Sequence, residues 1–205
     1  MDIGSDIMPS AVIHRCVSKI VNIKLNSKFV SSDNFYYELG SIAPDCWRHS
    51  ENLLDCNLTK KEKRQKSHFM TEKDKEDYET FYKEYKDKMD NTFIFGYLVH
   101  LITDNYWRNF TVKEYEESKK KEIYERLINE FVVYDIRKLT DEQINKIPRI
   151  KELDFSGLNR TLEYLYKNPI SSKEIDIDYT VVLKKLHKCS DFVLKEIAKL
   201  QKDNN

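Results

Sequence analysis

The chain has 205 residues, 40% of them hydrophobic and 12% aromatic, which is enough to close a sizeable core. Lysine plus arginine equals aspartate plus glutamate at 35 each, so no net charge favours nucleic acid or an anionic membrane as a partner. Only four glycines and four prolines are present, which disfavours a β-rich fold with many tight turns. The composition therefore predicts a single helical domain over residues 1–205.

The cysteines, the N-terminal sequence and the length of the most apolar run bear on the cellular location. The four cysteines follow no regular spacing, so a disulfide framework is not expected. The N-terminus lacks the pattern of a secretory signal peptide, and we expect residues 1–7 to form a disordered or additional segment. The most apolar run, FIFGYLVHLI, is too short to span a bilayer. These features predict a soluble cytoplasmic protein without a transmembrane segment.

The first third of the chain contains one clear helical pattern. Apolar residues at helical spacing predict a helix over residues 11–25. Residues 26–47 are expected to be irregular, with an X-Pro turn at Pro44 immediately before Asp45.

Capping pairs and helical periodicity predict the elements that follow. Thr59 with Glu62, and Thr71 with Asp74, have the spacing of a capping box. Aromatic and apolar side chains then recur every three or four residues, which predicts an amphipathic helix from Asp74 onward. Further helices are expected at residues 93–107, at 114–133, after a cap formed by Thr140 and Gln143, around 156–167, and at 178–201.

Two polar residues interrupt the apolar segment 93–107. His100 and Asp104 are four residues apart, so they share one helical face. Gly96 lies one turn earlier on that face and is expected to leave space beside His100. An ionised carboxylate in such a segment needs a partner charge, a metal or several hydrogen bonds. A buried His–Asp pair and part of a metal site are both open interpretations.

Other imidazoles and carboxylates lie in comparable surroundings. His14 interrupts the apolar run of the first helix, His68 adjoins an apolar pair, and Asp45 follows a turn. Neutral imidazole and carboxylate oxygen are the ligand types that suit zinc and similar divalent ions. His49 and His187 have polar neighbours, and we interpret both as surface histidines.

The order of four motifs, MPSAVIHR, FYYELGSIAPDCW, KSHF and GYLVHLITDNYW, resembles the zinc-dependent phospholipase C family, a distant relative of the S1/P1 single-strand nucleases. The likeness is to short bacterial members without a signal peptide. It covers residues 8–110, and its most specific element is GxxxHxxxD (Gly96, His100, Asp104). The resemblance implies an all-α, single-domain helical bundle of the phospholipase C / P1 nuclease type, with metals held between the helices.

The resemblance also implies a ligand set and an activity. By this analogy Asp45, His68, His100 and Asp104 ligate one metal, and Asp104 bridges to a second metal that also binds His14. The implied cofactor is zinc, as one or two ions, or another divalent metal. In the family a metal-activated water attacks a phosphate ester, and the carboxylate that matches Asp45 acts as general base. The implied protein is a phosphoric ester hydrolase acting on a small phosphate ester or a phospholipid head group.

The chain departs from the three-metal site of the family. No tryptophan precedes His14, and no histidine lies between Asp104 and His187, where the family has further ligands. Asp135 is a candidate replacement, but a reduced site of one or two metals is the simpler expectation. The alternative function is a non-catalytic metal-binding or interaction protein that retains the fold and part of the site.

Overall fold

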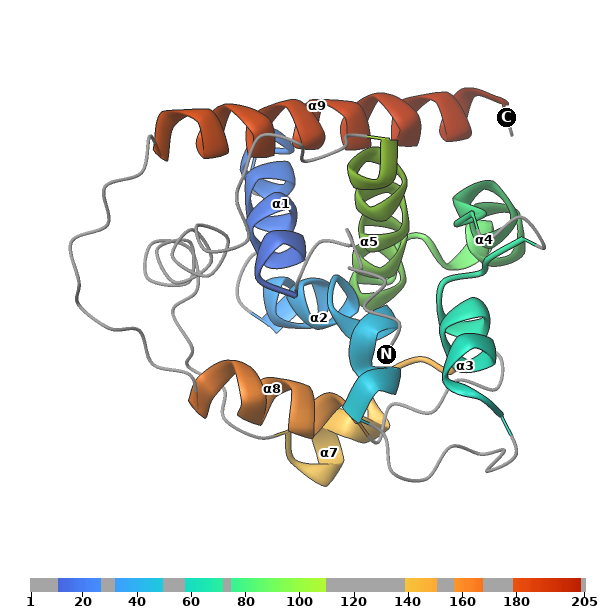
Figure 1. Ribbon diagram of the computed structural model, residues 1–205. Coiled ribbons are helices and arrows are strands. Elements are labelled where there is room, and N and C mark those ends of the chain that lie inside the picture. The colour runs from blue at the N-terminus through green and yellow to red at the C-terminus, as the bar shows by residue number, and fades with distance from the viewer. Residues whose placement is uncertain are drawn as a thin grey trace.

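The structure, a computed structural model, describes residues 11–26, 32–49, 58–71, 75–109, 139–150, 157–167 and 179–203. These residues form α1 (Ala11–Lys24), α2 (Ser32–Gly40), the 3-10 helix η1 (Ala43–His49), α3 (Lys60–Ser67), α4 (Tyr78–Tyr85), the 3-10 turn η2 (Lys86–Lys88), α5 (Thr92–Asn109), α7 (Asp141–Asn145), α8 (Leu158–Lys167) and α9 (Tyr179–Asp203) (Figure 1). Apart from an isolated antiparallel bridge between Met70 and Glu76, these ranges contain no β-structure. The predicted all-α fold class is confirmed.

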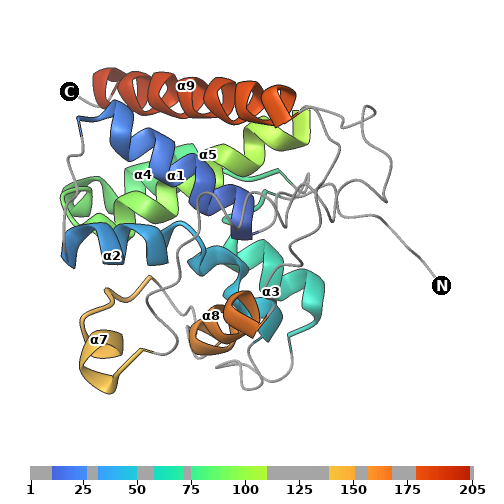
Figure 2. The ribbon, with the colours of Figure 1, turned by 90° about the vertical axis from the view of Figure 1, so that its left-hand side faces the viewer.

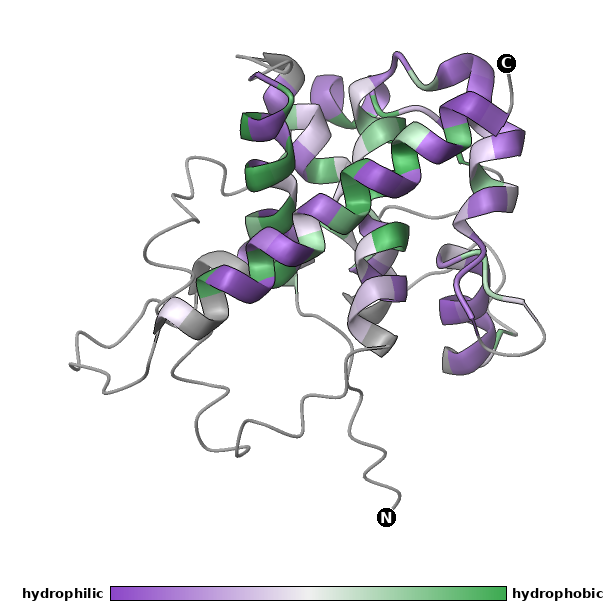
Figure 3. Ribbon diagram, turned by 90° about the horizontal axis from the view of Figure 1, so that it is seen from above, coloured by the Kyte–Doolittle hydropathy of each residue, from purple (hydrophilic) through white to green (hydrophobic). Residues whose placement is uncertain are grey.

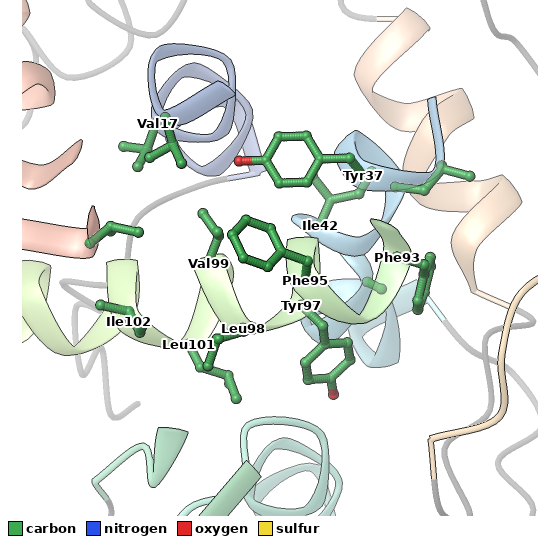
Figure 4. Close-up of a cluster of buried hydrophobic side chains, with 14 of the residues drawn as sticks. Val17, Tyr37, Ile42, Phe93, Phe95, Tyr97, Leu98, Val99, Leu101 and Ile102 are labelled. Carbon is green, nitrogen blue, oxygen red and sulfur yellow. The ribbon is translucent and has the colours of Figure 1, made fainter. Parts of the chain in front are cut away.

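Helix α5 is the centre of the fold. Residues 93–104 are all buried, as expected of a helix that is apolar on every side and must be surrounded. The helices α1, α2, α4 and α9 all pack against it. Phe95 and Val99 leave α5 toward α1 and α2, whereas Tyr97 and Leu101 leave it on the opposite side (Figure 4). The hydrophobic core therefore extends on both sides of α5.

Two glycines bring α2 and α5 into backbone contact. A Cβ atom on Gly96 would lie 2.1 Å from the carbonyl oxygen of Tyr37, and one on Gly40 would lie 2.1 Å from the carbonyl oxygen of Phe93. Each helix thus contributes one glycine to the contact. The space expected beside Gly96 is filled by the backbone of α2 and is not left open beside His100.

Helix α9 lies across α1 and α5 (Figures 1 and 2). Its buried apolar residues recur every three or four positions and form one stripe: Leu186, Cys189, Val193, Ile197 and Leu200. Hydrophilic residues alternate with the apolar ones along the helix (Figure 3). The ammonium of Lys24, the last residue of α1, lies 2.6 Å from a carboxylate oxygen of Asp191 and ties the two helices together at the surface.

Most predicted helices are confirmed with small shifts at their ends. Residues 11–25, 93–107, 156–167 and 178–201 correspond to α1, α5, α8 and α9. The capping boxes that begin α3 and α7 both form: each threonine side chain accepts from the N–H of the third helical residue, and the threonine N–H donates to the side chain of that residue. The helix predicted at residues 114–133 lies outside the described residues.

One sequence prediction about local structure is wrong, and one predicted helix begins later than expected. Most of residues 26–47 is helical, because α2 and the start of η1 occupy it. A nine-residue helix is too short for its period to stand out, and Pro44 is compatible with the first turn of a helix, whose N–H groups have no partner within the helix. The amphipathic helix expected from Asp74 onward is α4, which begins at Tyr78 with the Asp77 side chain accepting from the N–H of Thr80. Asp74, and with it the capping pair expected with Thr71, lies outside the described residues.

The described ranges contain three of the four cysteines. Cys16, Cys46 and Cys189 are buried and form no disulfide within these ranges, while Cys56 lies outside them, so the absence of a disulfide framework stays a prediction. None of the described helices combines the length and the apolarity that crossing a bilayer requires. The single-domain organisation and the cytoplasmic location stay predictions.

Candidate metal centre

Helix α5 supplies His100 and Asp104 from one face. Nε2 of His100 lies 3.4 Å from Oδ2 of Asp104, the separation of an i, i+4 pair, and both side chains are fully buried. Nδ1 of His100 lies 2.8 Å from the carbonyl oxygen of Ser41. Because a carbonyl oxygen only accepts, Nδ1 carries the proton, and the lone pair of Nε2 is free to face the interior.

His68 reaches the same place from the end of α3. Its Nδ1 atom lies 2.8 Å from the hydroxyl of Ser67 and 3.1 Å from the carbonyl oxygen of Arg64. This pairing again places the proton on Nδ1 and leaves Nε2 as an acceptor. Nε2 of His68 lies 3.3 Å from Nε2 of His100 and 3.4 Å from Oδ2 of Asp104.

Asp45 is the fourth donor and the most exposed one. It lies near the start of η1, directly after Pro44, and Oδ1 of its carboxylate is 3.6 Å from Nε2 of His68. Its exposed fraction is 7%, whereas the other four candidate ligands expose at most 1%. Within the described part of the chain, Asp45 is therefore the candidate ligand nearest to solvent.

His14 approaches from α1 on the far side of Asp104. Its ring stacks on that of His100, and its Nε2 atom lies 3.1 Å from Oδ1 of Asp104 and 4.0 Å from Oδ2 of Asp45. Despite the short distance to Asp104, the geometry does not make a hydrogen bond. Among the described residues, neither nitrogen of His14 and neither oxygen of Asp104 has a hydrogen-bond partner.

The donor separations fit a zinc ion. Nε2 of His68, Nε2 of His100 and Oδ2 of Asp104 form a nearly equilateral triangle with edges of 3.3, 3.4 and 3.4 Å. Around a tetrahedral ion with ligand bonds of about 2 Å, adjacent donors are about 3.3 Å apart. The buried oxygens of Asp104 accept no hydrogen bond from the described residues, so they also need a compensating partner, which a cation supplies. Asp104 faces three imidazoles, which is more than a simple His–Asp pair requires.

The charges in the cluster separate the protonation states of its members. Burial raises the pKa of Asp104, but the facing His100 and His14 outweigh it and hold that pKa well below its usual range. Burial lowers the pKa of His100, yet Asp104 and Asp45 outweigh it and raise the pKa overall. For His14, burial and the neighbouring His100 together lower the pKa. Asp104 is thus an anion and His14 a neutral imidazole at neutral pH, the forms that bind a metal.

The structure brings all five predicted site residues, His14, Asp45, His68, His100 and Asp104, into one buried cluster. Two groups of three lie within it, His14 with His100 and Asp104, and Asp45 with His68 and His100. Their role as metal ligands stays a prediction. His187 is exposed, as predicted; the burial of His49 and the whole of Asp135 lie outside the described residues.

Sequence reasoning missed the groups that hold the imidazoles. Ser67 lies directly before His68 in KSHF, and a hydroxyl beside a histidine was the available indication of its role. The carbonyl oxygen of Ser41 carried no indication, because it reaches His100 only through the packing of α2 against α5. Tyr97 was also missed; its hydroxyl donates to the carbonyl oxygen of Ser67.

An all-α fold with a buried cluster of three imidazoles and two carboxylates defines the class of helical proteins that can hold a divalent metal between helices. The model of a family described as zinc dependent phospholipase C matches residues 8–204. The chain belongs to the zinc-dependent phospholipase C family, as the sequence motifs predicted. The match extends well beyond residues 8–110, to which those motifs are confined. Comparisons with curated proteins and with solved structures give no match.

Proposed function

We propose that the protein is a metal-dependent phosphoesterase with a reduced site of one or two zinc ions. The observation that carries the proposal is the triangle formed by His68, His100 and Asp104, whose edges of 3.3 to 3.4 Å suit adjacent ligands of one ion. Asp45 is the proposed fourth ligand. The proposed substrate class is a small phosphate ester or a phospholipid head group, in keeping with the family.

His14 and the second oxygen of Asp104 are the proposed donors to a second ion. They face each other at 3.1 Å on the side of Asp104 that is turned away from His68. A bridging carboxylate serves two ions because each of its oxygens can face one of them. Two protein donors hold an ion more weakly than four do, so we expect this second ion to bind less tightly than the first.

The proposed roles of the residues follow from how exposed each side chain is to solvent. When bound, zinc would acidify a water molecule and offset the negative charge of the phosphoryl oxygens. Asp45 is the proposed general base, because its carboxylate is the most exposed of the cluster and can accept a proton at Oδ2 while Oδ1 faces His68. The buried His68 and His100, each held through Nδ1, keep their Nε2 atoms directed into the site.

A non-catalytic metal-binding protein is the second candidate, and one observation favours it. Four protein donors are enough to close the tetrahedron of a structural zinc ion, and four of the five candidate ligands are almost completely buried. Catalysis requires a position for water in addition to the protein ligands. The two candidates therefore differ in whether the bound ion retains an open position.

Zinc content and hydrolysis, measured on the same purified protein, test the proposal. We expect zinc to remain after dialysis, and turnover of a phosphodiester such as bis(p-nitrophenyl) phosphate that depends on it. Asp45→Asn is expected to lose most of the turnover while keeping most of the bound zinc. His68→Ala is expected to lose both the turnover and the zinc. The exposed His187 offers a matched control, since His187→Ala leaves both unchanged.

The outcomes separate the two candidates. Bound zinc without hydrolysis of a phosphodiester, a phosphomonoester or phosphatidylcholine micelles supports the non-catalytic protein. Zinc content that is the same in the wild type and in His68→Ala overturns both candidates, because the ion would then lie elsewhere.

A further inference from the structure

The turn that follows α3 places an aromatic residue where glycine is usual. The N–H of Phe69 donates to the carbonyl of Lys66 at 3.3 Å, and the N–H of Met70 donates to that of Gln65 at 2.9 Å. These two bonds define a Schellman motif with His68 as the C-cap. Phe69 has a φ of 50°, the left-handed conformation that is unfavourable for a residue with a Cβ atom. An unfavourable backbone conformation persists only where its surroundings impose it.

The aromatic ring of Phe69 explains how this conformation is held. It packs edge-on against Phe81, Tyr85 and Tyr97, with ring centroids 5.0, 6.2 and 6.3 Å away. Phe81 and Tyr97 are stacked on each other at 5.0 Å, so the three partners of Phe69 belong to one cluster between α4 and α5. Glycine would suit the backbone of this turn but would leave it without an anchor.

A hydrogen bond from Tyr97 fastens the same turn to α5. The buried Tyr97 hydroxyl donates to the carbonyl oxygen of Ser67, the last residue of α3. Helix α3 packs mainly against η1, so this bond is a direct tie from the turn to the helix that carries His100 and Asp104. Tyr97 leaves α5 on the side opposite Phe95 (Figure 4).

The hydrogen bond from Tyr97 to Ser67 lies next to the two groups that set the tautomer of His68. The hydroxyl of Ser67 and the carbonyl of Arg64 both contact Nδ1 of His68, and both belong to the last turn of α3. A shift of this turn would therefore move the proton-holding partners and the imidazole together. Such outer partners of metal-ligating histidines fix ring orientation as well as tautomer.

We propose that Tyr97 is a positioning residue for His68, and that Phe69 anchors the turn at the end of α3. Its hydroxyl fixes the end of α3 relative to α5 and so aligns Nε2 of His68 with Nε2 of His100 and Oδ2 of Asp104. The part of this inference that concerns zinc affinity rests on the proposed function. The part that concerns the alignment of the His68 imidazole in the metal-free protein is independent of the proposed function.

Tyr97→Phe tests the inference, because it keeps the stacked ring and removes only the hydroxyl. Tyr78→Phe is the matched control, since it removes a hydroxyl that donates to Glu196 at 3.0 Å between α4 and α9, away from the site. Chelator competition measures zinc affinity, and long-range ¹H–¹⁵N spectra of the metal-free protein report the tautomer of His68. We expect Tyr97→Phe to weaken zinc binding about tenfold and to mix the two tautomers. Tyr78→Phe changes neither.

Phe69→Gly provides a second variant whose backbone favours the same turn. It removes the anchor, so we expect weaker zinc binding and a mixed tautomer again, although the left-handed conformation itself becomes easier. Unchanged zinc affinity together with an unchanged His68 spectrum in the folded Tyr97→Phe protein overturns the inference. If the wild type binds no zinc, the proposed function fails, and the spectrum of the metal-free protein still decides whether Tyr97 positions the imidazole.

Discussion

The imidazole of His14 lies flat against that of His100, with ring centroids 3.6 Å apart and 13° between the planes. The two residues come from α1 and α5, and both direct Nε2 toward the carboxylate of Asp104. His14 faces Oδ1 at 3.1 Å, and His100 faces Oδ2 at 3.4 Å. Because each oxygen has a different imidazole before it, we expect a change at Asp104 to disturb both halves of the cluster.

Asp104→Asn is predicted to lose zinc and turnover together. The amide keeps the size of the side chain but replaces one acceptor oxygen by an NH₂ group, which cannot ligate a cation. His100→Ala removes a donor of the triangle and should have the same effect. Zinc affinity should fall by more than the roughly 10- to 100-fold typical of losing an outer partner. Unchanged zinc stoichiometry in either variant, measured after dialysis, contradicts the prediction.

The free energy of unfolding of the metal-free protein should depend on pH in the acid range because of Asp104. The facing His100 and His14 outweigh burial and depress the pKa of this carboxyl. Ionised Asp104 therefore stabilises the fold above its unfolded pKa of about 4, and this contribution is lost as the pH falls through the folded value. Below about pH 4 the wild type should lose free energy of unfolding more steeply than Asp104→Asn. Urea unfolding of chelator-treated protein over a pH series measures both slopes, and parallel curves contradict the prediction.

Zinc affinity should continue to rise with pH above the usual pKa of histidine. Burial lowers the pKa of His100, but Asp104 and Asp45 outweigh it and raise that pKa. The charged form of His100 thus stabilises the metal-free fold below about pH 6.5, and this contribution is lost as the pH rises through the raised value. Protons compete with zinc for the imidazole over the same interval. Chelator competition from about pH 6 to 8 checks this, and a plateau already at 6.5 contradicts it.

The sequence predicted the parts of the site whose causes are local. His100 and Asp104 stand out because two polar residues at helical spacing interrupt an apolar run. The capping boxes of α3 and α7 are likewise contained in four consecutive residues. His14, Asp45 and His68 were joined to this pair only by the order of the motifs, since nothing in spacing alone brings separate helices to one point.

Contacts between elements could not be predicted from the sequence. From the sequence, Gly96 suggests open space beside His100, but its missing side chain is what allows the carbonyl of Tyr37 to approach. The bond from Nδ1 of His100 to the carbonyl oxygen of Ser41 depends on that approach. Helix α2 itself was missed, because the nine residues that form it are stabilised mainly by packing against α5.

Gly96→Ala is predicted to destabilise the protein and to weaken the site at once. The added methyl would lie 2.1 Å from the carbonyl oxygen of Tyr37, so α2 and α5 must separate. We expect a loss of about 3 kcal/mol in the free energy of unfolding, the upper end for an added methyl in a packed interior. The carbonyl of Ser41 should move away from His100, and zinc affinity should fall with it.

Leu101→Ala is the control for this effect. Leu101 is fully buried on α5 but points away from α2 (Figure 4), so its truncation costs stability without forcing the two helices apart. Both variants should show a lower free energy of unfolding, measured in urea. Only Gly96→Ala should bind zinc more weakly while still folded. Equal zinc affinities in the two variants contradict a role for the α2–α5 contact in placing His100.

Glu38→Gln is predicted to loosen the contact between α1 and α2. Nε of Arg15 donates to Oε2 of Glu38 at 3.1 Å and Nη2 donates to the same oxygen, while the amide of Asn34 donates to Oε1 at 3.0 Å. The side chains of Arg15 and Glu38 are only 11% and 13% exposed. Glutamine keeps the shape but removes the charge, so we expect a loss of about 2 kcal/mol in the free energy of unfolding.

The exposed pair of Glu142 and Lys146 shows why burial decides this result. Its atoms approach to 2.7 Å, but the two side chains are 79% and 60% exposed, so water screens the attraction. Glu142→Gln should therefore leave the urea midpoint unchanged, whereas Glu38→Gln lowers it. Equal shifts in the two variants would show that the Arg15–Glu38 pair stabilises the fold no more than a surface ion pair does. The packing of α1 on α2 would then depend on their other contacts, such as the hydrogen bond of 2.9 Å from the Tyr37 hydroxyl to the carbonyl oxygen of Ser18.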